Sequence, residues 1–233
     1  MKEVLKMNKL KEMFGHEKPV IALLHIRALP GDPWFSHGTA MEMIVESAKR
    51  DLLALQEGGV DGVLCSNEYS LPYQTRVDAV TVAAMARVVS ELRHDIKAPF
   101  GVHVISDSAA TIELAAALEA DFVRSVFTGA YAGESGLQSR NIAEILRRKK
   151  ELNLENLIMF YMINAESEGD ISGRELPDVA RALIFKCRPD ALCVSGQSAG
   201  READLEMISA VREASGGVPV FCNTGVNYEN VES

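Results

Sequence analysis

In residues 58–68 the chain reads GGVDGVLCSNE, and this stretch decides the fold. A glycine pair ends a helical pattern, a nearly continuous apolar run follows, and polar side chains come directly after it. Parallel strands that are buried on both faces have this pattern. Similar apolar runs occur at residues 19–25, 60–66, 100–105, 122–127, 157–163, 191–195 and 218–222. Helical patterns lie between them, so the chain predicts a parallel sheet, either a barrel or a doubly wound fold.

Local signals predict where the helices begin. Thr39 with Glu42 has the spacing of a capping box, and Ser108 and Ser139 are candidate caps of later helices. Pro177 suits a first helical turn. No linker rich in proline, glycine or serine divides the 233 residues, so we expect a single domain. Residues 1–18 predict an N-terminal helical segment that covers the bottom of the sheet.

Composition and charge exclude several classes of protein. The 24 Lys and Arg residues against 33 Asp and Glu give a net charge of −9. Broad electrostatic binding to nucleic acid or an anionic membrane is therefore not expected. No apolar run approaches the ~20 residues of a membrane helix, and the N-terminus lacks an apolar signal core. The four cysteines form no C-x-x-C pair, which predicts reduced thiols and a cytoplasmic protein.

The loops that follow the strands are longer and more polar than those that precede them. In barrels the active site is built from the strand-to-helix loops. The candidate general acid or base residues at this face are His25, Glu68 and Asp107. A purely structural alternative is that His25 bonds a loop carbonyl group. Glu68 is the better candidate, because a carboxylate directly after a buried strand needs a partner.

Further polar residues and glycines predict a binding site for a phosphorylated small molecule. The candidate substrate-binding residues are His103, Arg124, Asn164, Ser195, Gly196, Gly200, Asn223, Thr224 and Gly225. Backbone N–H groups of the three glycines would hold the phosphate, helped by the helix start near Arg201. No Cys and His cluster has zinc spacing, and the acidic loop at residues 164–174 has no spacing that demands a metal. The sequence names no cofactor.

Together, several motifs make the chain resemble the BtpA/SgcQ family. They lie at residues 19–25 with 29–33, 59–63 with 67–68, 120–124 with 128–130, 190–196, and 223–226 with 229–231. The resemblance covers essentially the whole chain and implies a phosphate-binding barrel of the TIM type. We therefore predict a (β/α)8-type barrel domain at residues 1–233 with seven visible units. A complete barrel usually needs ~250 residues. We expect the eighth strand to be truncated, unobserved, or replaced by another segment or subunit.

The resemblance leaves two functions open. One is an enzyme acting on a phosphorylated sugar or nucleotide-like metabolite, with isomerase, lyase or hydrolase chemistry. The other is a non-catalytic assembly or regulatory protein, since cyanobacterial members are implicated in photosystem I accumulation and others accompany sugar-uptake genes. The chain departs from the family pattern at Asn67-Glu68, where the order is reversed, and at His103 and Asn164. Barrels of this kind often associate through their outer helices, so we expect a homo-oligomer.

Overall fold

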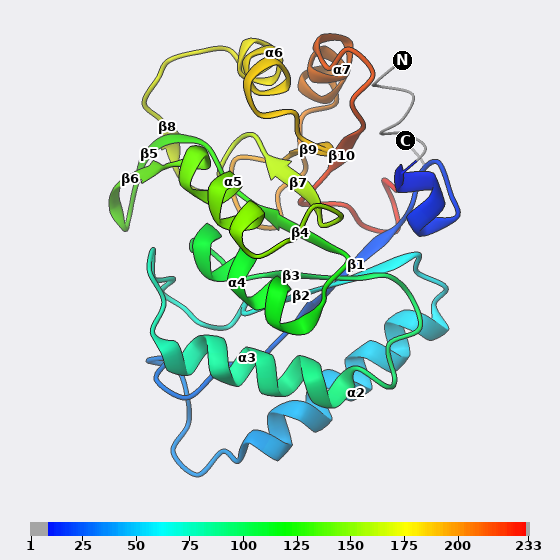
Figure 1. Ribbon diagram of the computed structural model, residues 1–233, viewed down its shortest axis with the longest axis vertical. Coiled ribbons are helices and arrows are strands. Elements are labelled where there is room, and N and C mark those ends of the chain that lie inside the picture. Colours follow the sequence, from blue (N-terminus) through cyan, green and yellow to red (C-terminus); the bar gives the residue numbers. More distant parts are fainter. Residues whose placement is uncertain (1–8, 232–233) are drawn as a thin grey trace. The chain divides into compact units, whose positions relative to one another are not determined.

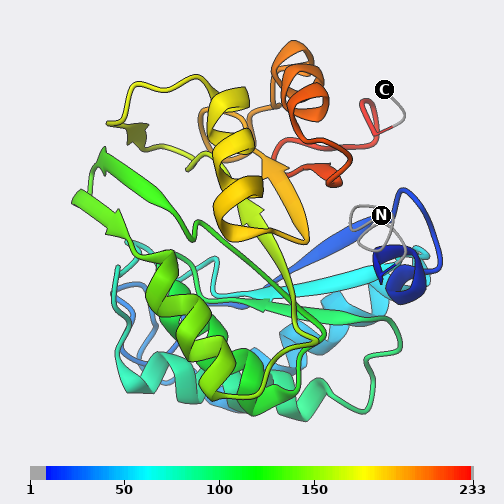
Figure 2. The same ribbon diagram turned by 45° about the horizontal axis from the view of Figure 1, so that its top comes forward.

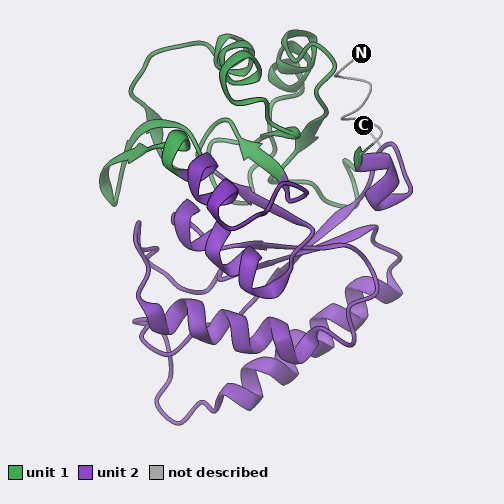
Figure 3. Cartoon of the chain, in the orientation of Figure 1, with its two compact units in different colours: residues 1–9, 126–144, 159–233 green, residues 10–125, 145–158 purple. Residues whose placement is uncertain are grey.

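The structure, a computed structural model, describes residues 9–231. The described chain divides into two compact units, which have different colours in Figure 3. Unit 2 comprises residues 10–125 and 145–158, and unit 1 comprises Lys9 and residues 126–144 and 159–231. Each unit has its own group of parallel strands. The single domain at residues 1–233 stays a prediction.

Unit 2 contains the first four strands, which are parallel and neighbour one another in chain order. They are β1 (Ile21–His25), β2 (Gly62–Ser66), β3 (Phe100–His103) and β4 (Phe122–Ser125). The helices between them are α2 (Met41–Glu57), α3 (Ala79–Leu92) and α4 (Ser108–Leu118). Figures 1 and 2 both show these helices against the same face of the strands. The sequence predicted all four strands, each two residues longer at one end.

Side chains alternate between the two faces of this sheet because successive residues of a strand point in opposite directions. Val63, Val102 and Val123 are fully buried on the face that the helices cover. The opposite face carries a row made of Leu23, Leu64, Gly101 and Phe122, which are partners in register. A Cβ atom on Gly101 would lie inside contact distance of the Phe122 ring. Glycine at this position therefore makes room for the ring.

The chain before β1 packs at the start of these strands. Residues 9–14 are helical, and residues 1–8 of the predicted N-terminal segment lie outside the described residues. Leu10 and Phe14 are buried. The Phe14 ring meets the Phe122 ring edge to face at a centroid distance of 5.6 Å, and it also lies against Gly62. This helix thus contributes apolar side chains at the amino-terminal ends of β2 and β4.

Unit 1 contains three more parallel strands. They are β7 (Ile158–Met162, whose first residue belongs to unit 2), β9 (Ala191–Val194) and β10 (Val220–Cys222). The helix α5 (Ile142–Glu151) runs from unit 1 into unit 2, and α6 (Leu176–Cys187) and α7 (Leu205–Ala214) pack together within unit 1. Phe160 and Phe221 stack at a centroid distance of 5.0 Å. Residues 9–231 therefore hold the seven parallel strands that the sequence predicts.

A small antiparallel sheet in unit 1 was not predicted. Its strands are β5 (Gly129–Gly133), β6 (Gly136–Arg140) and β8 (Gly169–Asp170), in the order β6-β5-β8. These segments are short, rich in glycine and without an apolar run, so the sequence pattern predicts no strands there. Leu137 on β6 is 80% exposed, so the sheet lacks the clear alternation of a half-buried strand.

Three predicted helix caps are wrong. The residue before α2 is Ala40, which makes no side-chain cap bond, so the capping box of Thr39 and Glu42 does not form. Asp107, not Ser108, caps α4 through its side chain. Ser139 lies within β6. Pro177 does occupy the first turn of α6. Neighbouring polar residues compete for a cap, and sequence alone does not decide between positions one residue apart.

The four cysteines are free, as predicted. Burial raises the pKa of the Cys65 thiol to about 12, so this thiol stays protonated at neutral pH. Within residues 9–231 no helix is long and apolar enough to cross a membrane.

Candidate functional site

A row of polar side chains crosses the carboxyl ends of the four strands of unit 2. His25 is the register partner of Ser66, and Ser66 is the partner of His103. Val102 pairs with Val123, which places His103 level with Arg124. Register partners in parallel strands point to the same side of the sheet. The row of His25, Ser66, His103 and Arg124 therefore lies on the face opposite the helices.

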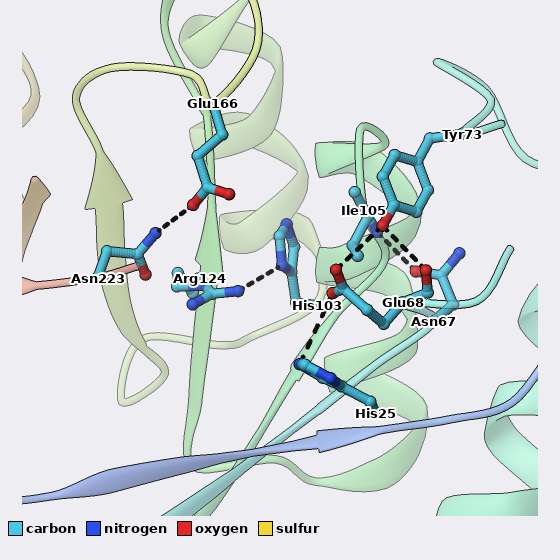
Figure 4. A network of polar contacts seen from close by, with 9 residues as sticks. All are labelled: His25, Asn67, Glu68, Tyr73, His103, Ile105, Arg124, Glu166 and Asn223. Carbon is cyan, nitrogen blue, oxygen red and sulfur yellow. Dashed lines mark hydrogen bonds and ion pairs between the residues drawn. The ribbon is translucent and has the colours of Figure 1, made fainter. Parts of the chain in front are cut away.

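Glu68 joins this row from the loop after β2. Its Oε2 atom lies 3.8 Å from Nε2 of His25, and both side chains are about one-third exposed. The Tyr73 hydroxyl donates to the Glu68 backbone carbonyl at 2.9 Å and contacts Glu68 Oε1 at 3.2 Å. Figure 4 shows the carboxylate between Tyr73 and His25. The pair is close enough for electrostatic attraction and too far apart for a direct hydrogen bond.

Asn67 fixes the backbone directly before Glu68. Its side chain is 1% exposed, and its Oδ1 atom accepts a hydrogen bond from the Ile105 N–H group at 2.8 Å (Figure 4). This bond ties the loop after β2 to the loop after β3. Two independent contacts, those of Asn67 and Tyr73, therefore hold the chain on both sides of Glu68. A carboxylate held in this way can be positioned with little entropy loss on ligand binding.

His103 and Arg124 are buried neighbours in the row. His103 is 4% and Arg124 is 8% exposed, and Nδ1 of His103 lies 3.3 Å from a terminal nitrogen of Arg124. Burial, and then the charge of Arg124, lower the pKa of His103 well below its ordinary value of 6.5. A guanidinium group can only donate, so Nδ1 accepts and the ring proton resides on Nε2. His103 is thus a neutral imidazole that donates from Nε2.

This state of His103 predicts how stability depends on pH. Above pH 6.5 the ring is neutral in both the folded and the unfolded chain, so it does not make the free energy of unfolding depend on pH. Below pH 6.5 the histidine of the unfolded chain binds a proton that folded His103 does not bind. The free energy of unfolding therefore decreases as the pH is lowered, until the pH reaches the lowered pKa of folded His103. The loss is at most about 1.4 kcal/mol per pH unit. Urea unfolding of the wild type and His103→Gln at neutral pH and at about pH 5.5 checks this; equal slopes would contradict it.

Asp107 does not join the row. Its Oδ1 atom accepts from the Ala110 N–H group at 3.0 Å, which caps α4, and its Oδ2 atom accepts from the Val77 N–H group at 2.9 Å. Both carboxylate oxygens therefore hold backbone groups of two different segments. This accounts for the buried position of Asp107 by structure alone. Its catalytic role stays a prediction, and the geometry assigns it a capping role.

A second polar network lies in unit 1, after β7, β9 and β10. Asn164 bonds the Ser195 backbone twice, by donating to the carbonyl at 2.7 Å and accepting from the N–H group at 3.0 Å. The Asn223 amide nitrogen lies 2.7 Å from the Ser195 hydroxyl and 3.1 Å from Oε1 of Glu166 (Figure 4). Asn164, Ser195 and Asn223 thus come together as predicted substrate-binding residues, and Thr224 follows in the next turn.

Two of the three glycines predicted to hold phosphate, Gly196 and Gly225, are explained by contacts within the protein. A Cβ atom on Gly196 would lie within 3.0 Å of the Arg201 carbonyl, and one on Gly225 would be equally close to the Glu202 backbone nitrogen. Gly200 and Gly225 have positive φ angles, of 75° and 78°. These turns approach their own neighbours, so the glycine pattern is not specific for a ligand. Their phosphate contacts stay a prediction.

The start of α7 already has an acidic partner. Asp204 caps this helix, and its Oδ1 atom accepts from the Glu206 N–H group at 2.9 Å. Glu202 lies two residues before the cap, and its carboxylate accepts from the Asn230 amide at 2.7 Å. A carboxylate at a helix start occupies the position that a bound phosphate would take. The expected help from the helix start near Arg201 is therefore not supported.

The motif at residues 29–33 shapes a cavity in unit 2. Oδ2 of Asp32 accepts from the Leu29 N–H group at 2.6 Å and from the Ser70 hydroxyl at 2.7 Å, which joins the loops after β1 and β2. The cavity has a volume of about 280 Å³. It is lined by Gly31, Asp32, Pro33, Asn67, Ser70, Pro72, Gln74, Val77 and Thr81. Because Asn67 precedes Glu68, this wall also supports the candidate carboxylate.

Sequence reasoning missed Ser66 and Tyr73. Ser66 could have been found from strand alternation, because it shares the side of His25 and His103 once the strands are aligned. Tyr73 lies in a loop, and no local pattern indicates its partner. Within the described residues no group of three His, Cys, Asp or Glu side chains could hold a metal ion.

Comparison with solved structures shows the fold class of this protein. The 7,8-dihydropteroate synthase of Vibrio fischeri superimposes with a TM-score of 0.56 at 13% identity, covering 87% of this chain and 72% of the synthase. A dihydrodipicolinate synthase gives 0.52 at 15% identity, covering 88% and 63%. With the seven parallel strands, these likenesses show an α/β fold of the TIM-barrel type that lacks one strand in residues 9–231. The predicted fold class is confirmed.

The chain belongs to the BtpA family, whose model matches residues 16–233. The putative sgc region protein SgcQ of Escherichia coli K12 is 44% identical, covering 97% of this chain and 84% of that protein. The photosystem I biogenesis protein BtpA of Synechocystis is 30% identical, covering 95% and 77%. The resemblance inferred from the motifs is therefore confirmed.

Proposed function

We propose that this protein is an enzyme that moves protons on a phosphorylated sugar or a nucleotide-like metabolite. The observation that carries the proposal is the pair of His25 and Glu68 at the carboxyl ends of β1 and β2. Both side chains are about one-third exposed, and their distance of 3.8 Å leaves the Glu68 carboxylate free to exchange a proton with a ligand. Carboxylate and imidazole groups are the usual general bases and acids of enzymes.

Each residue of the row has a role in this proposal. Glu68 takes or gives the proton, and His25 lies beside it on the neighbouring strand. Tyr73 limits the rotation of the Glu68 side chain. Arg124 supplies a fixed positive charge in a buried place, which suits the phosphate of the ligand because a guanidinium binds phosphate with two parallel hydrogen bonds.

We further propose a cytoplasmic location and a homo-oligomeric state.

A thermal-shift screen tests this function. The purified protein is heated with phosphorylated sugars and nucleotides of three to six carbons in the sugar, each beside its dephosphorylated counterpart. A ligand at 100 times its Kd stabilises the folded state by about 2.7 kcal/mol. We expect stabilisation by at least one phosphorylated compound and none by its counterpart. If no phosphorylated compound stabilises the folded protein, the proposal is wrong.

A second candidate function is that of a non-catalytic assembly or regulatory protein. The observation that favours it is the 30% identity to a protein named for photosystem I biogenesis. The two functions differ in what they require of the His25 and Glu68 pair. An assembly role that uses the barrel as a binding module would survive the double replacement of His25→Asn and Glu68→Gln. Catalysis by this pair would not survive it.

A further inference from the structure

The Ser66 hydroxyl is an unusual group in the row. Ser66 is the last residue of β2 and is fully buried, and its Oγ atom has no hydrogen-bond partner within residues 9–231. Nε2 of His25, directly opposite on β1, is also shielded from solvent and without a hydrogen bond in the described chain. Leaving a buried hydroxyl unsatisfied costs about 1–3 kcal/mol. Two such atoms on strands about 4.8 Å apart indicate a place for a further polar atom.

A hydrogen-bond donor, His103, lies on β3, on the side of Ser66 away from β1. His103 is the register partner of Ser66, and the contact with Arg124 leaves the proton of His103 on Nε2. The hydroxyl of Ser66 and the Nε2–H group of His103 are therefore two uncharged donors on adjacent strands. Uncharged donors held by a rigid sheet can bind an oxygen atom that gains negative charge during a reaction, with no rearrangement at that moment.

We propose that Ser66 and His103 hold the carbonyl oxygen of the substrate, and that the reaction removes a proton from the carbon next to this carbonyl. This inference rests on the proposed function and narrows it to carbonyl-containing sugar phosphates. The substrate carbon would lie toward Glu68, whose carboxylate enters the row from the loop after β2.

The chemical step is balanced without any further reagent. The Glu68 carboxylate takes a proton from the carbon beside the carbonyl. The electron pair of the broken C–H bond forms a C=C bond, and the π pair of the carbonyl moves onto its oxygen, which Ser66 and His103 stabilise. The proton of the neighbouring hydroxyl then passes to this oxygen, and Glu68 returns its proton to the former carbonyl carbon, which gives isomerisation.

Matched ligands separate this inference from the proposed function. Three pairs are used: dihydroxyacetone phosphate with glycerol 3-phosphate, D-ribulose 5-phosphate with D-ribitol 5-phosphate, and D-fructose 6-phosphate with D-mannitol 6-phosphate. The second member of each pair lacks the carbonyl group. We expect one ketose phosphate to bind more tightly than its reduced partner and to take up deuterium from D₂O beside its carbonyl. If both members of every pair bind equally and no deuterium enters, this inference fails and the proposed function stands. If none binds, this inference fails, and the thermal-shift screen decides the proposed function.

Variants of Ser66 show whether its hydroxyl is responsible. Ser66→Ala is expected to lower deuterium uptake by about 10²–10³-fold, the usual effect of removing one donor to a developing oxyanion. Affinity for the reduced ligand should not change, and Ser66→Thr, which keeps the hydroxyl, should retain most of the activity and also controls for folding. Ser125→Ala is the matched control, because Ser125 is the last residue of β4 in the same sheet but bonds Ser108 of α4 at 2.9 Å on the helix side. Equal rates in Ser66→Ala and Ser125→Ala would overturn the inference.

Discussion

Replacing Glu68 by Gln is expected to slow proton transfer by about 10²–10⁴-fold. The amide cannot take a proton, while its oxygen can still accept a hydrogen bond from Tyr73 in place of the carboxylate oxygen. The fold and the ligand site should therefore remain. The rate is measured as deuterium uptake by the metabolite that stabilises the wild type most, and its Kd should change only a few-fold.

Glu166→Gln is the matched control for this prediction. Glu166 is also a carboxylate in a loop after a strand, and its side-chain partner is the amide of Asn223. We expect it to change the rate only a few-fold. If Glu68→Gln behaves like Glu166→Gln, then Glu68 is not the group that transfers the proton. If the double variant of His25→Asn and Glu68→Gln supports the cellular function fully, the assembly role is favoured over catalysis.

Replacing Gly225 by Ala is expected to lower the free energy of unfolding by about 2–5 kcal/mol. A left-handed backbone costs a residue with a Cβ atom about 1–2 kcal/mol, and Gly225 has a φ angle of 78°. The new methyl group would also collide with the backbone of Arg201 and Glu202, which adds about 1–3 kcal/mol. Urea unfolding at neutral pH measures the loss.

Gly200→Ala separates the two causes. Gly200 has nearly the same φ angle, 75°, but nothing lies within 4 Å of the position that its Cβ atom would take. Only the conformational cost of about 1–2 kcal/mol is expected there. If Gly225→Ala loses as little free energy of unfolding as Gly200→Ala, then a Cβ atom at residue 225 does not clash with residues 201–202. The comparison also tests why these glycines are needed, since a phosphate-binding role predicts no such difference in the absence of ligand.

The positions of the parallel strands along the chain could be predicted because each is a short apolar run between a helix end and a polar residue. Their register could not, because register is set by contacts between strands far apart in the sequence. Ser66 shows the difference. In the sequence it is one more residue of an apolar run, and only the alignment of β1, β2 and β3 places it between two histidines. His25 and Glu68 were found because polar groups at strand ends are visible without that alignment.

The loops explain most of the remaining differences. Asp107 has the sequence position of a catalytic residue, but it holds the backbone of Val77 and Ala110. The glycine turns after β9 and β10 have the composition of phosphate loops, but they press on their own neighbours. A short polar side chain or a glycine after a strand serves a cap, a tight turn or a ligand equally well. Which of these applies depends on contacts that are distant in the chain.

The row of His25, Ser66, His103 and Arg124 comes from one uninterrupted part of the chain, and its strands neighbour one another in the order of synthesis. Chains are made at about 5–20 residues per second, and N-terminal regions fold first. Residues 25–124 therefore leave the ribosome several seconds before β9 and β10 are complete. Each strand of the row after β1 meets a partner that already exists when it emerges. The polar face that we assign to proton transfer can thus form its strand pairs while the rest of the chain is still being made.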